Sequence, residues 1–165
     1  MKSKAKITPS LWFDDEAEQA VDFYVGIFPA SRIVAVSRYG EAGQEVHKKP
    51  PGSVMTIAFE LDGQPFTALN GGPVFEFNPA ISFQIMCENQ DEIDHYWTQL
   101  SADADPARQQ CGWLTDRYGV SWQVVPGILP EMMADTDPAR SQRVMQALLK
   151  MKKLDINELK RAYHG

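Results

Sequence analysis

The side chains in this sequence that could do chemistry are mainly hydroxyls, amides and indoles, and most of them recur at every second residue of short segments. Such alternation places one set of side chains on a single face of a β-strand. The set holds no carboxylate pair for acid–base catalysis and no nucleophile beside a base. It suits a neutral, flat or partly apolar ligand. The predicted ligand-binding residues are Thr8, Ser10, Trp12, Asn70, Ser82, Gln84 and Gln123, with Met86 and Val125 as apolar neighbours.

Residue types that hold transition metals are few and do not fall on the expected strands. His47 lies in a Gly/Pro-rich loop, His95 in an expected helix, and His164 one residue from the end. Cys87 and Cys111 lack the spacing of a metal site or a disulfide framework, so we interpret them as core or rim thiols. The sequence therefore predicts no metal and no cofactor.

Composition narrows the class of protein. The chain has 165 residues, of which 44% are hydrophobic and 23% charged, and this balance excludes disorder. The net charge of −6 argues against binding to a phosphate backbone. No apolar run is long enough to span a bilayer, and the basic segment 1–10 is not followed by the apolar core of a signal peptide. We expect a single soluble domain in the cytoplasm.

The elements that must position these residues occur in two similar sets. In the first set, Asp15 with Glu18 three residues later predicts a helix start, and Pro29 predicts its end. In the second, Asn89 with Glu92 predicts a helix start. The expected strands are residues 6–13, 32–39, 53–62 and 66–70, with a hairpin turn at 62–63, and then 80–87, extended pieces through 109–115, a turn at 116–119, and 120–125.

The two sets also correspond in residues, which favours a duplication. The helix segment 20–24 corresponds to 92–96, and the hairpin end 62–66 corresponds to 118–122. The alternative is an unrelated α+β arrangement with the same order of elements. We therefore predict an α+β domain over residues 1–126, composed of two βαβββ modules at about 5–72 and 79–126. Strand parity turns Trp122 toward a helix, whereas Trp12 is either a stacking platform or part of the core.

Two further segments have open roles. The loop 40–52 is either a mobile lid over a ligand or a crossover of no consequence. Residues 127–165 form a helical extension, in which Asp137 before Pro138 and Asp155 before Glu158 predict helix starts. The apolar stripe of this extension must pack on the modules or on a second subunit.

Many of these segments together resemble the PhnB-like branch of the vicinal oxygen chelate superfamily, which includes glyoxalases, bleomycin-resistance proteins and extradiol dioxygenases. The nearest resemblance is to the domain labelled 3-demethylubiquinone-9 3-methyltransferase. The segments that carry it are 18–24 with 28–29, 61–64, 68–73, 82–83, 94–97, 111–113, 116–126 and, in the tail, 148–156.

The resemblance implies that each module is half of an eight-stranded open cup with a helix behind each half, and that the protein is a homodimer. Metal-dependent relatives carry His, Gln or Glu ligands on the first and last strands of each module. The matching positions here are Thr8 or Ser10, Thr67 or Ala68 with Asn70 beyond, Ser82, and Gln123. Because hydroxyls and amides are poor ligands for transition metals, we expect none to bind.

The leading functional hypothesis is metal-independent binding of a small neutral or aromatic molecule, with no nucleic-acid or membrane partner. A second is an enzyme of the same superfamily, such as an isomerase, lyase or dioxygenase, and a third is an interaction protein that acts through its C-terminal helices. Whether the protein is an enzyme stays open. Methyl transfer is disfavoured, because Pro73 after Gly71-Gly72 does not suit a glycine-rich cofactor turn.

Overall fold

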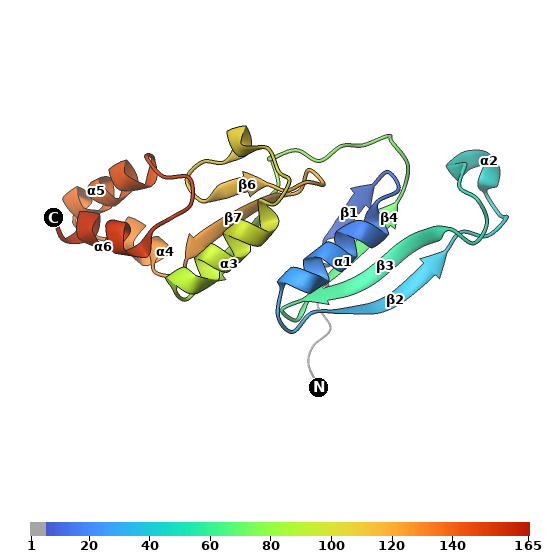
Figure 1. Ribbon diagram of the computed structural model, residues 1–165, viewed down its shortest axis with the longest axis horizontal. Coiled ribbons are helices and arrows are strands. Elements are labelled where there is room, and N and C mark those ends of the chain that lie inside the picture. Colours follow the sequence, from blue (N-terminus) through green and yellow to red (C-terminus); the bar gives the residue numbers. More distant parts are fainter. Residues whose placement is uncertain (1–5) are drawn as a thin grey trace. The chain divides into compact units, whose positions relative to one another are not determined.

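The structure is a computed structural model that describes residues 6–165 (Figure 1). The chain divides into two compact units, Met1–Phe77 and Asn78–Gly165, which are described one at a time. The sequence analysis placed the boundary between the modules at 72–79. The predicted start of the first module at about residue 5, and residues 1–5 of the basic segment, lie outside the described residues.

The first unit is one βαβββ module, as predicted. Its elements are β1 (Ser10–Phe13), α1 (Ala17–Ile27), β2 (Arg32–Arg38), α2 (Gln44–His47), β3 (Val54–Leu61) and β4 (Gln64–Asn70). The four strands form one sheet, hereafter the first sheet, in the order β1-β4-β3-β2, with β1 parallel to β4 and the other pairs antiparallel. The Asp62-Gly63 turn joins β3 to β4 with both φ angles positive, which is the geometry of a two-residue hairpin turn.

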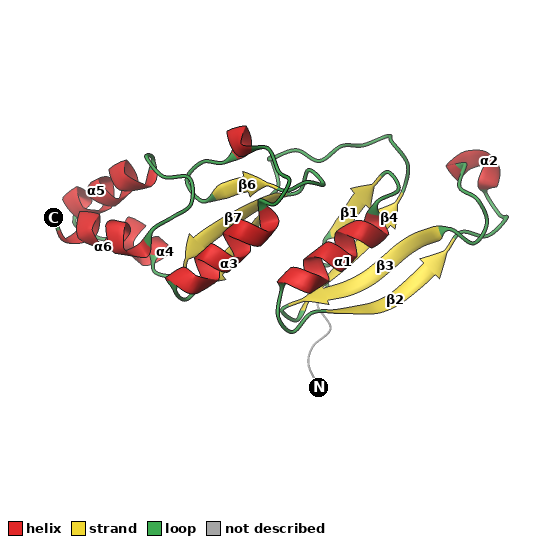
Figure 2. Cartoon of the chain, in the orientation of Figure 1, coloured by secondary structure: helices red, strands yellow, loops and turns green. Residues whose placement is uncertain are grey.

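Helix α1 covers one face of the first sheet (Figure 2). Along β3 and β4, buried residues such as Ile57, Phe59 and Ala68 alternate with half-buried ones such as Thr56 and Thr67. The buried set packs under Ala20, Val21 and Tyr24 of the helix. The sheet therefore has a helix-covered face and an opposite face, which we call the open face of the first sheet.

The start of α1 differs from the prediction. The helix begins at Ala17 with Glu16 as N-cap, and no side chain of its own segment caps it, so the predicted Asp15–Glu18 capping box is absent. Instead the Oδ1 atom of Asn70, at the end of β4, accepts from the Ala17 N–H at 2.9 Å. A residue distant in sequence does what a local cap usually does, and nothing in the pattern of residues 15–18 could indicate it.

The second unit repeats this plan with one strand fewer. It contains β5 (Phe83–Cys87), α3 (Gln90–Leu100), a 3₁₀ turn η1 (Pro106–Arg108), β6 (Trp113–Thr115) and β7 (Ser121–Pro126). The second sheet has the order β5-β7-β6, with β5 parallel to β7 as β1 is to β4. Among residues 6–165 there are therefore seven strands, rather than the eight that the resemblance implies.

A tight turn stands where the eighth strand was expected. Gln110 and Trp113 form an isolated bridge, and Cys111 and Gly112 between them have φ angles of 53° and 83°. Two central residues with positive φ make a primed hairpin turn, so the extended pieces at 109–115 reverse direction instead of forming a longer strand. Asn89, by contrast, caps α3 as predicted and accepts from the Glu92 N–H at 3.0 Å.

The C-terminal extension belongs to the second unit and forms α4 (Leu129–Met133), α5 (Pro138–Leu148) and α6 (Ile156–His164). Asp137 and Asp155 cap α5 and α6 as predicted, whereas α4 was not anticipated. None of the helices in the described part of the chain combines the length and apolar character that a membrane span requires. The apolar side chains that join the extension to β7 are Val125, Met132, Val144, Met151, Leu154 and Leu159.

Candidate functional site

The open face of the second sheet, which is the face away from α3, carries a row of three side chains, one from each strand. Trp113 of β6 lies opposite Gln123 of β7, and Gln123 lies opposite Gln84 of β5. Partners in register project to the same face of a sheet, so the indole and both amides lie side by side. We call this set the Trp113–Gln84 row. The Trp113 side chain is 37% exposed, and Gln84 is exposed as well.

Hydrogen bonds link the polar members of this row to Ser82. The Gln84 Nε2 atom donates to Gln123 Oε1 at 3.2 Å, and Gln123 Nε2 donates to Ser82 Oγ at 2.8 Å. Three of the predicted ligand-binding residues, Ser82, Gln84 and Gln123, are therefore in direct contact. Because each amide is held by its neighbour, the chain orients its remaining donors and acceptors.

Hydroxyl groups lie on the same face beside this row. Thr115 of β6 lies opposite Ser121 of β7, and their hydroxyl oxygens are 3.4 Å apart. Both side chains are buried, unlike those of the Trp113–Gln84 row. The hydroxyls therefore form the supporting edge of the polar region, whereas the amides and the indole are its accessible part.

Val125 does not line the site as the sequence analysis predicted. It is only 7% exposed and packs against Met132, Val144 and Leu154 of the C-terminal extension. The segment before α6 is also tied to the turn at 111–112, where the Cys111 N–H donates to Met151 O at 2.9 Å. The extension thus packs on the second module, at the end of β7, and Val125 belongs to the core of that contact. Met86 stays 47% exposed.

The open face of the first sheet is less polar. Ser10 and Trp12 of β1 lie opposite Thr67 and Leu69 of β4, and Ser10 is exposed. Thr8 is exposed and precedes the first residue of β1, so no strand partner orients it. The structure therefore keeps Ser10 and Trp12 together on one strand but does not place Thr8 in the same element.

Trp12 packs against Phe75 and against the backbone of Gly71 and Gly72. Its Nε1–H donates to Gly72 O at 2.9 Å, and its ring meets that of Phe75 edge-on, with centroids 4.9 Å apart. A Cβ added at Gly71 would lie 2.3 Å from the Trp12 Cζ2 atom, so the backbone of Gly71 lies directly against the indole. The half-buried indole keeps no free N–H, and the double-glycine segment serves to seat it.

Asn70 is not available to a ligand. It is 5% exposed, its Oδ1 accepts from the Ala17 N–H, and its Nδ2 donates to Val54 O at 3.2 Å. Its parity along β4 places it on the helix-covered face, with Phe66 and Ala68. We therefore correct this assignment: Asn70 joins the start of α1 to β3 and β4, and both ends of its amide are used.

The loop 40–52 is folded around α2 and fastened at two points. Lys49 Nζ donates to Asp14 O at 2.8 Å, and the ring of Tyr39 lies 4.4 Å from that of His47. The Tyr39 hydroxyl donates to Asn70 O at 2.6 Å. The ends of β1 and β4 and this loop thus share one hydrogen-bonded network. The role of the loop 40–52 as a lid stays a prediction.

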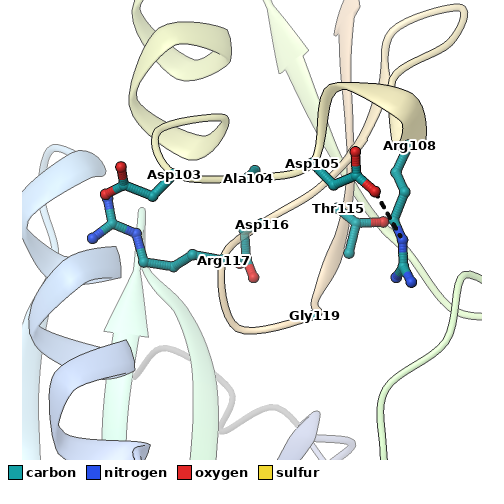
Figure 3. Close-up of a pocket in the computed structure, with 8 residues that line it drawn as sticks. All are labelled: Asp103, Ala104, Asp105, Arg108, Thr115, Asp116, Arg117 and Gly119. Atoms are coloured by element: carbon teal, nitrogen blue, oxygen red, sulfur yellow. Dashed lines mark ion pairs between the residues drawn. The ribbon is translucent and has the colours of Figure 1, made fainter.

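A cavity of about 250 Å³ lies beside the turn between β6 and β7 (Figure 3). Arg117 pairs with Asp103 at 3.0 Å, and Arg108 approaches Asp105 at 4.0 Å, so each guanidinium at the rim has an acidic neighbour. The carboxylate of Asp116 accepts from the N–H groups of Tyr118 and Val120 and from Trp122 Nε1. These charges are paired within the protein, and we assign no ligand to the cavity.

Residues at the positions that correspond to metal ligands do not fit a transition metal. Gln123 and Ser82 are hydrogen-bonded to each other, and Ala68 has no donor atom. Across residues 6–165, no three His, Cys, Asp or Glu side chains are grouped to hold an ion. Neutral amide and hydroxyl oxygens lack the charge and basicity that borderline metals prefer.

The two thiols lie in different environments. Cys87 is buried on the helix-covered face of β5, and burial raises the pKa of its thiol to about 12, with the Glu92 charge adding to the effect. Cys111 is half-buried in the tight turn, where Gln110 Nε2 donates to its sulfur at 3.4 Å. The raised pKa disfavours a thiolate at Cys87 in the folded protein.

Sequence reasoning missed Trp113 as a member of the site. Its position opposite Gln123 depends on the register of β6, a three-residue strand whose alternation is too short to recognise. Trp122, in contrast, is turned toward α3 as predicted and is 2% exposed. The sequence shows which side chains share a face in a long strand, because the alternation is long enough to recognise, but not in a short one.

Comparison with known proteins places the fold. No curated protein sequence matches the chain. The PhnB protein of Bacillus cereus is 36% identical, with a TM-score of 0.64 over 74% of this chain and 99% of that one. Two structures are similar in fold alone: PA1353 of Pseudomonas aeruginosa (18% identity, TM-score 0.57, 74% of this chain and 98% of that one) and the fosfomycin resistance protein FosX of Mesorhizobium loti (15%, 0.54, 81% and 99%).

A family model confirms the resemblance found in the sequence. The model described as 3-demethylubiquinone-9 3-methyltransferase matches residues 5–125, which include both modules and stop before the C-terminal extension. The α+β class, with two sheets and C-terminal helices, agrees with this match. The chain therefore belongs to the 3-demethylubiquinone-9 3-methyltransferase family, which the PhnB protein of Bacillus cereus also resembles in its description.

Proposed function

We propose that this protein binds a small neutral or aromatic molecule without a metal, and that the open face of the second sheet supplies the polar contacts. The observation that carries the proposal is the hydrogen-bonded set of Ser82, Gln123 and Gln84 beside the exposed indole of Trp113. Oriented amides next to an aromatic surface are the usual means of holding a flat, uncharged ligand.

The chemistry of the face supports binding over catalysis. The Trp113–Gln84 row has no titratable side chain, so it cannot move a proton near neutral pH. The one carboxylate on the open face of the first sheet, Glu60, is ion-paired with Arg32 at 2.9 Å. Amides and hydroxyls can orient a ligand and discriminate its shape, which is the work of a binding or sequestering protein.

Methyl transfer is not part of the proposal, although the family's description names it. The double-glycine segment that could suggest a cofactor turn is occupied by the ring and N–H of Trp12. If the purified protein moved a labelled methyl group from S-adenosylmethionine to a quinone precursor, this judgement would be wrong.

We further propose that the protein is a cytoplasmic homodimer. The exposed Ile33, Val34 and Val36 on the edge strand β2 support a dimer. Light scattering of the full chain tests the dimer.

The test of the binding proposal is a titration of the metal-stripped, full-length chain with flat neutral aromatic compounds, followed by indole fluorescence and amide NMR. We expect saturable binding that Trp113→Ala and Gln123→Leu weaken about tenfold or more. The matched control is Gln99→Leu, on the exposed face of α3, which should not alter binding.

Two outcomes would defeat the proposal. One is a requirement for metal, seen as near one equivalent of Zn, Ni, Mn or Fe per chain in the purified protein together with loss of binding after its removal. The other is binding that survives both Trp113→Ala and Gln123→Leu unchanged, which would move the site away from the second sheet.

A further inference from the structure

The direction of the hydrogen-bonded chain on the second sheet limits the kind of ligand that the site can satisfy. Gln84 Nε2 donates to Gln123 Oε1, and Gln123 Nε2 donates to Ser82 Oγ. This uses one N–H of Gln84, and the residue, which also carries a second N–H and the Oε1 atom, is exposed. At the other end of the chain, the Ser82 hydroxyl still has its proton to donate.

The outer end of the Gln84 amide offers the same two kinds of group whichever way the amides are turned. If both amide groups were reversed, Ser82 would donate to Gln123, and Gln123 to Gln84. The outer end of the Gln84 amide would still present an acceptor and a donor together. The Gln84 amide therefore ends in a donor and an acceptor in either orientation. A ligand that pairs with both needs a donor beside an acceptor.

The side chains beside the hydrogen-bonded amides favour a flat ligand. Trp113 projects from β6 onto the same face, beside Gln123, and Met86 follows Gln84 by two residues on β5, so an apolar side chain lies next to each amide. Both side chains are partly exposed, at 37% and 47%. An indole ring and a thioether stabilise planar rings through dispersion and stacking contacts.

We propose that the ligand of the second sheet is a planar ring compound that carries an N–H beside a carbonyl, that is, a lactam or an aromatic carboxamide. This inference rests on the proposed function and adds the ligand class to it. The Gln84 amide pairs with the N–H and carbonyl of the ligand, Gln123 and Ser82 hold Gln84 in place, and Trp113 covers the ring. A ligand with only one of the two groups leaves a polar atom of the amide without a partner, which weakens binding.

The experiment compares 2-quinolone with N-methyl-2-quinolone, which has the same ring and carbonyl but no N–H. The full-length chain is titrated with each compound, and the side-chain amide signals of Gln84 and Gln123 and the indole signal of Trp113 are followed by NMR. We expect 2-quinolone to shift all three signals and to bind at least about tenfold more tightly than its N-methyl analogue.

Testing both compounds on a set of variants separates the loss of a hydrogen bond to the ligand from a general effect on the fold. Gln84→Leu should reduce the affinity for 2-quinolone to that of the N-methyl analogue and leave the analogue itself unaffected. Gln99→Leu, an exposed glutamine on α3, should alter neither, and Ser82→Ala should have a smaller effect in the direction of Gln84→Leu.

The outcomes distinguish this inference from the proposal beneath it. If both compounds bind equally and shift the Trp113 signal, the lactam inference is overturned while the binding function stands. If 2-quinolone shifts only the Trp12 signal of the first unit, the inference is also overturned. If neither compound binds at the limit of solubility, the inference fails together with the assignment of a flat neutral ligand to this face.

Discussion

The two modules share a topology but hold it together by different means. In the first, Asn70 reaches from the end of β4 to the start of α1, and the same amide binds β3. In the second, Asn89 caps α3 locally, and the buried Asp116 ties the hairpin between β6 and β7 to Trp122. The amide of Asn70 is thus structural and lies on the helix-covered face, whereas the amides of Gln84 and Gln123 lie on the open face of their sheet.

The difference extends to the open faces. The first sheet presents a tryptophan whose N–H and one side are occupied by the segment 71–72. The second presents Trp113 and two linked glutamines that are partly exposed. The two modules are thus similar in topology, and the polar groups on the open face of the second are linked to one another and partly exposed.

The largest expected effect concerns the two capping asparagines. Asn70→Ala leaves the Ala17 N–H and Val54 O without their partner in the buried interior, so we expect a loss of about 3 kcal/mol in the free energy of unfolding. Asn89→Ala removes one exposed local cap and should cost about 1 kcal/mol. Denaturant unfolding of both variants measures the contrast, and equal losses would show that Asn70 is not a long-range cap.

Next in size is the contact between Gly71 and Trp12. Gly71→Ala introduces a Cβ that collides with the indole, and we expect a loss of about 2 kcal/mol with a red shift of Trp12 emission as the ring is displaced. The matched control is Gly26→Ala in α1, where nothing lies within 4 Å of the added Cβ. That change should stabilise the helix by up to about 1 kcal/mol. A neutral Gly71→Ala variant would contradict the seating of Trp12.

The two thiols of the second module should also differ in reactivity. At pH 8 the Cys87 thiol, with its pKa raised to about 12 by burial, is almost wholly protonated and should resist alkylation until the protein unfolds. Cys111 is half-buried in its turn and should be labelled first. Mass spectrometry of the native protein then finds one modified thiol per chain. After Cys111→Ser, any rapid native labelling would show that Cys87 is accessible.

The smallest effect concerns the attachment of the C-terminal extension. Lys153 Nζ lies 2.5 Å from Asp94 Oδ1, and this hydrogen bond lowers the pKa of the Asp94 carboxyl. A carboxyl with a lowered folded-state pKa contributes stability above the unfolded value of about 4, and this contribution disappears as the pH falls through the folded value. Both side chains are more than a third exposed, so the contribution is small.

Hydrogen exchange of α6 between pH 6 and pH 3 measures this effect. We expect protection to fall more in the native chain than in Lys153→Gln, which lacks the pair at every pH. Asp135, whose carboxyl pKa is lowered by a hydrogen bond from Tyr163, titrates in the same direction in both proteins and cancels in the comparison. Identical pH profiles would mean that the Lys153–Asp94 pair does not help to hold the extension.

Much of the architecture was predictable because it depends on local patterns. The long alternation along β3 and the helical stripes of α1 and α3 indicated the elements, and the repeated order of elements indicated two similar modules. The polar set of Ser82, Gln84 and Gln123 followed from strand parity alone. Each of these features needs only neighbours within a few residues along the chain.

Tertiary structure decided the features that depend on partners distant in sequence. Asn70 was read as a ligand-binding residue, but Ala17 and Val54 occupy its amide; Val125 was read as lining, but the C-terminal helices cover it. Trp113 joined the site only through the register of a three-residue strand. Residue types and their spacing set which face of a strand is polar, whereas the contacts that bury some of those residues and leave others free arise only when separate segments pack together.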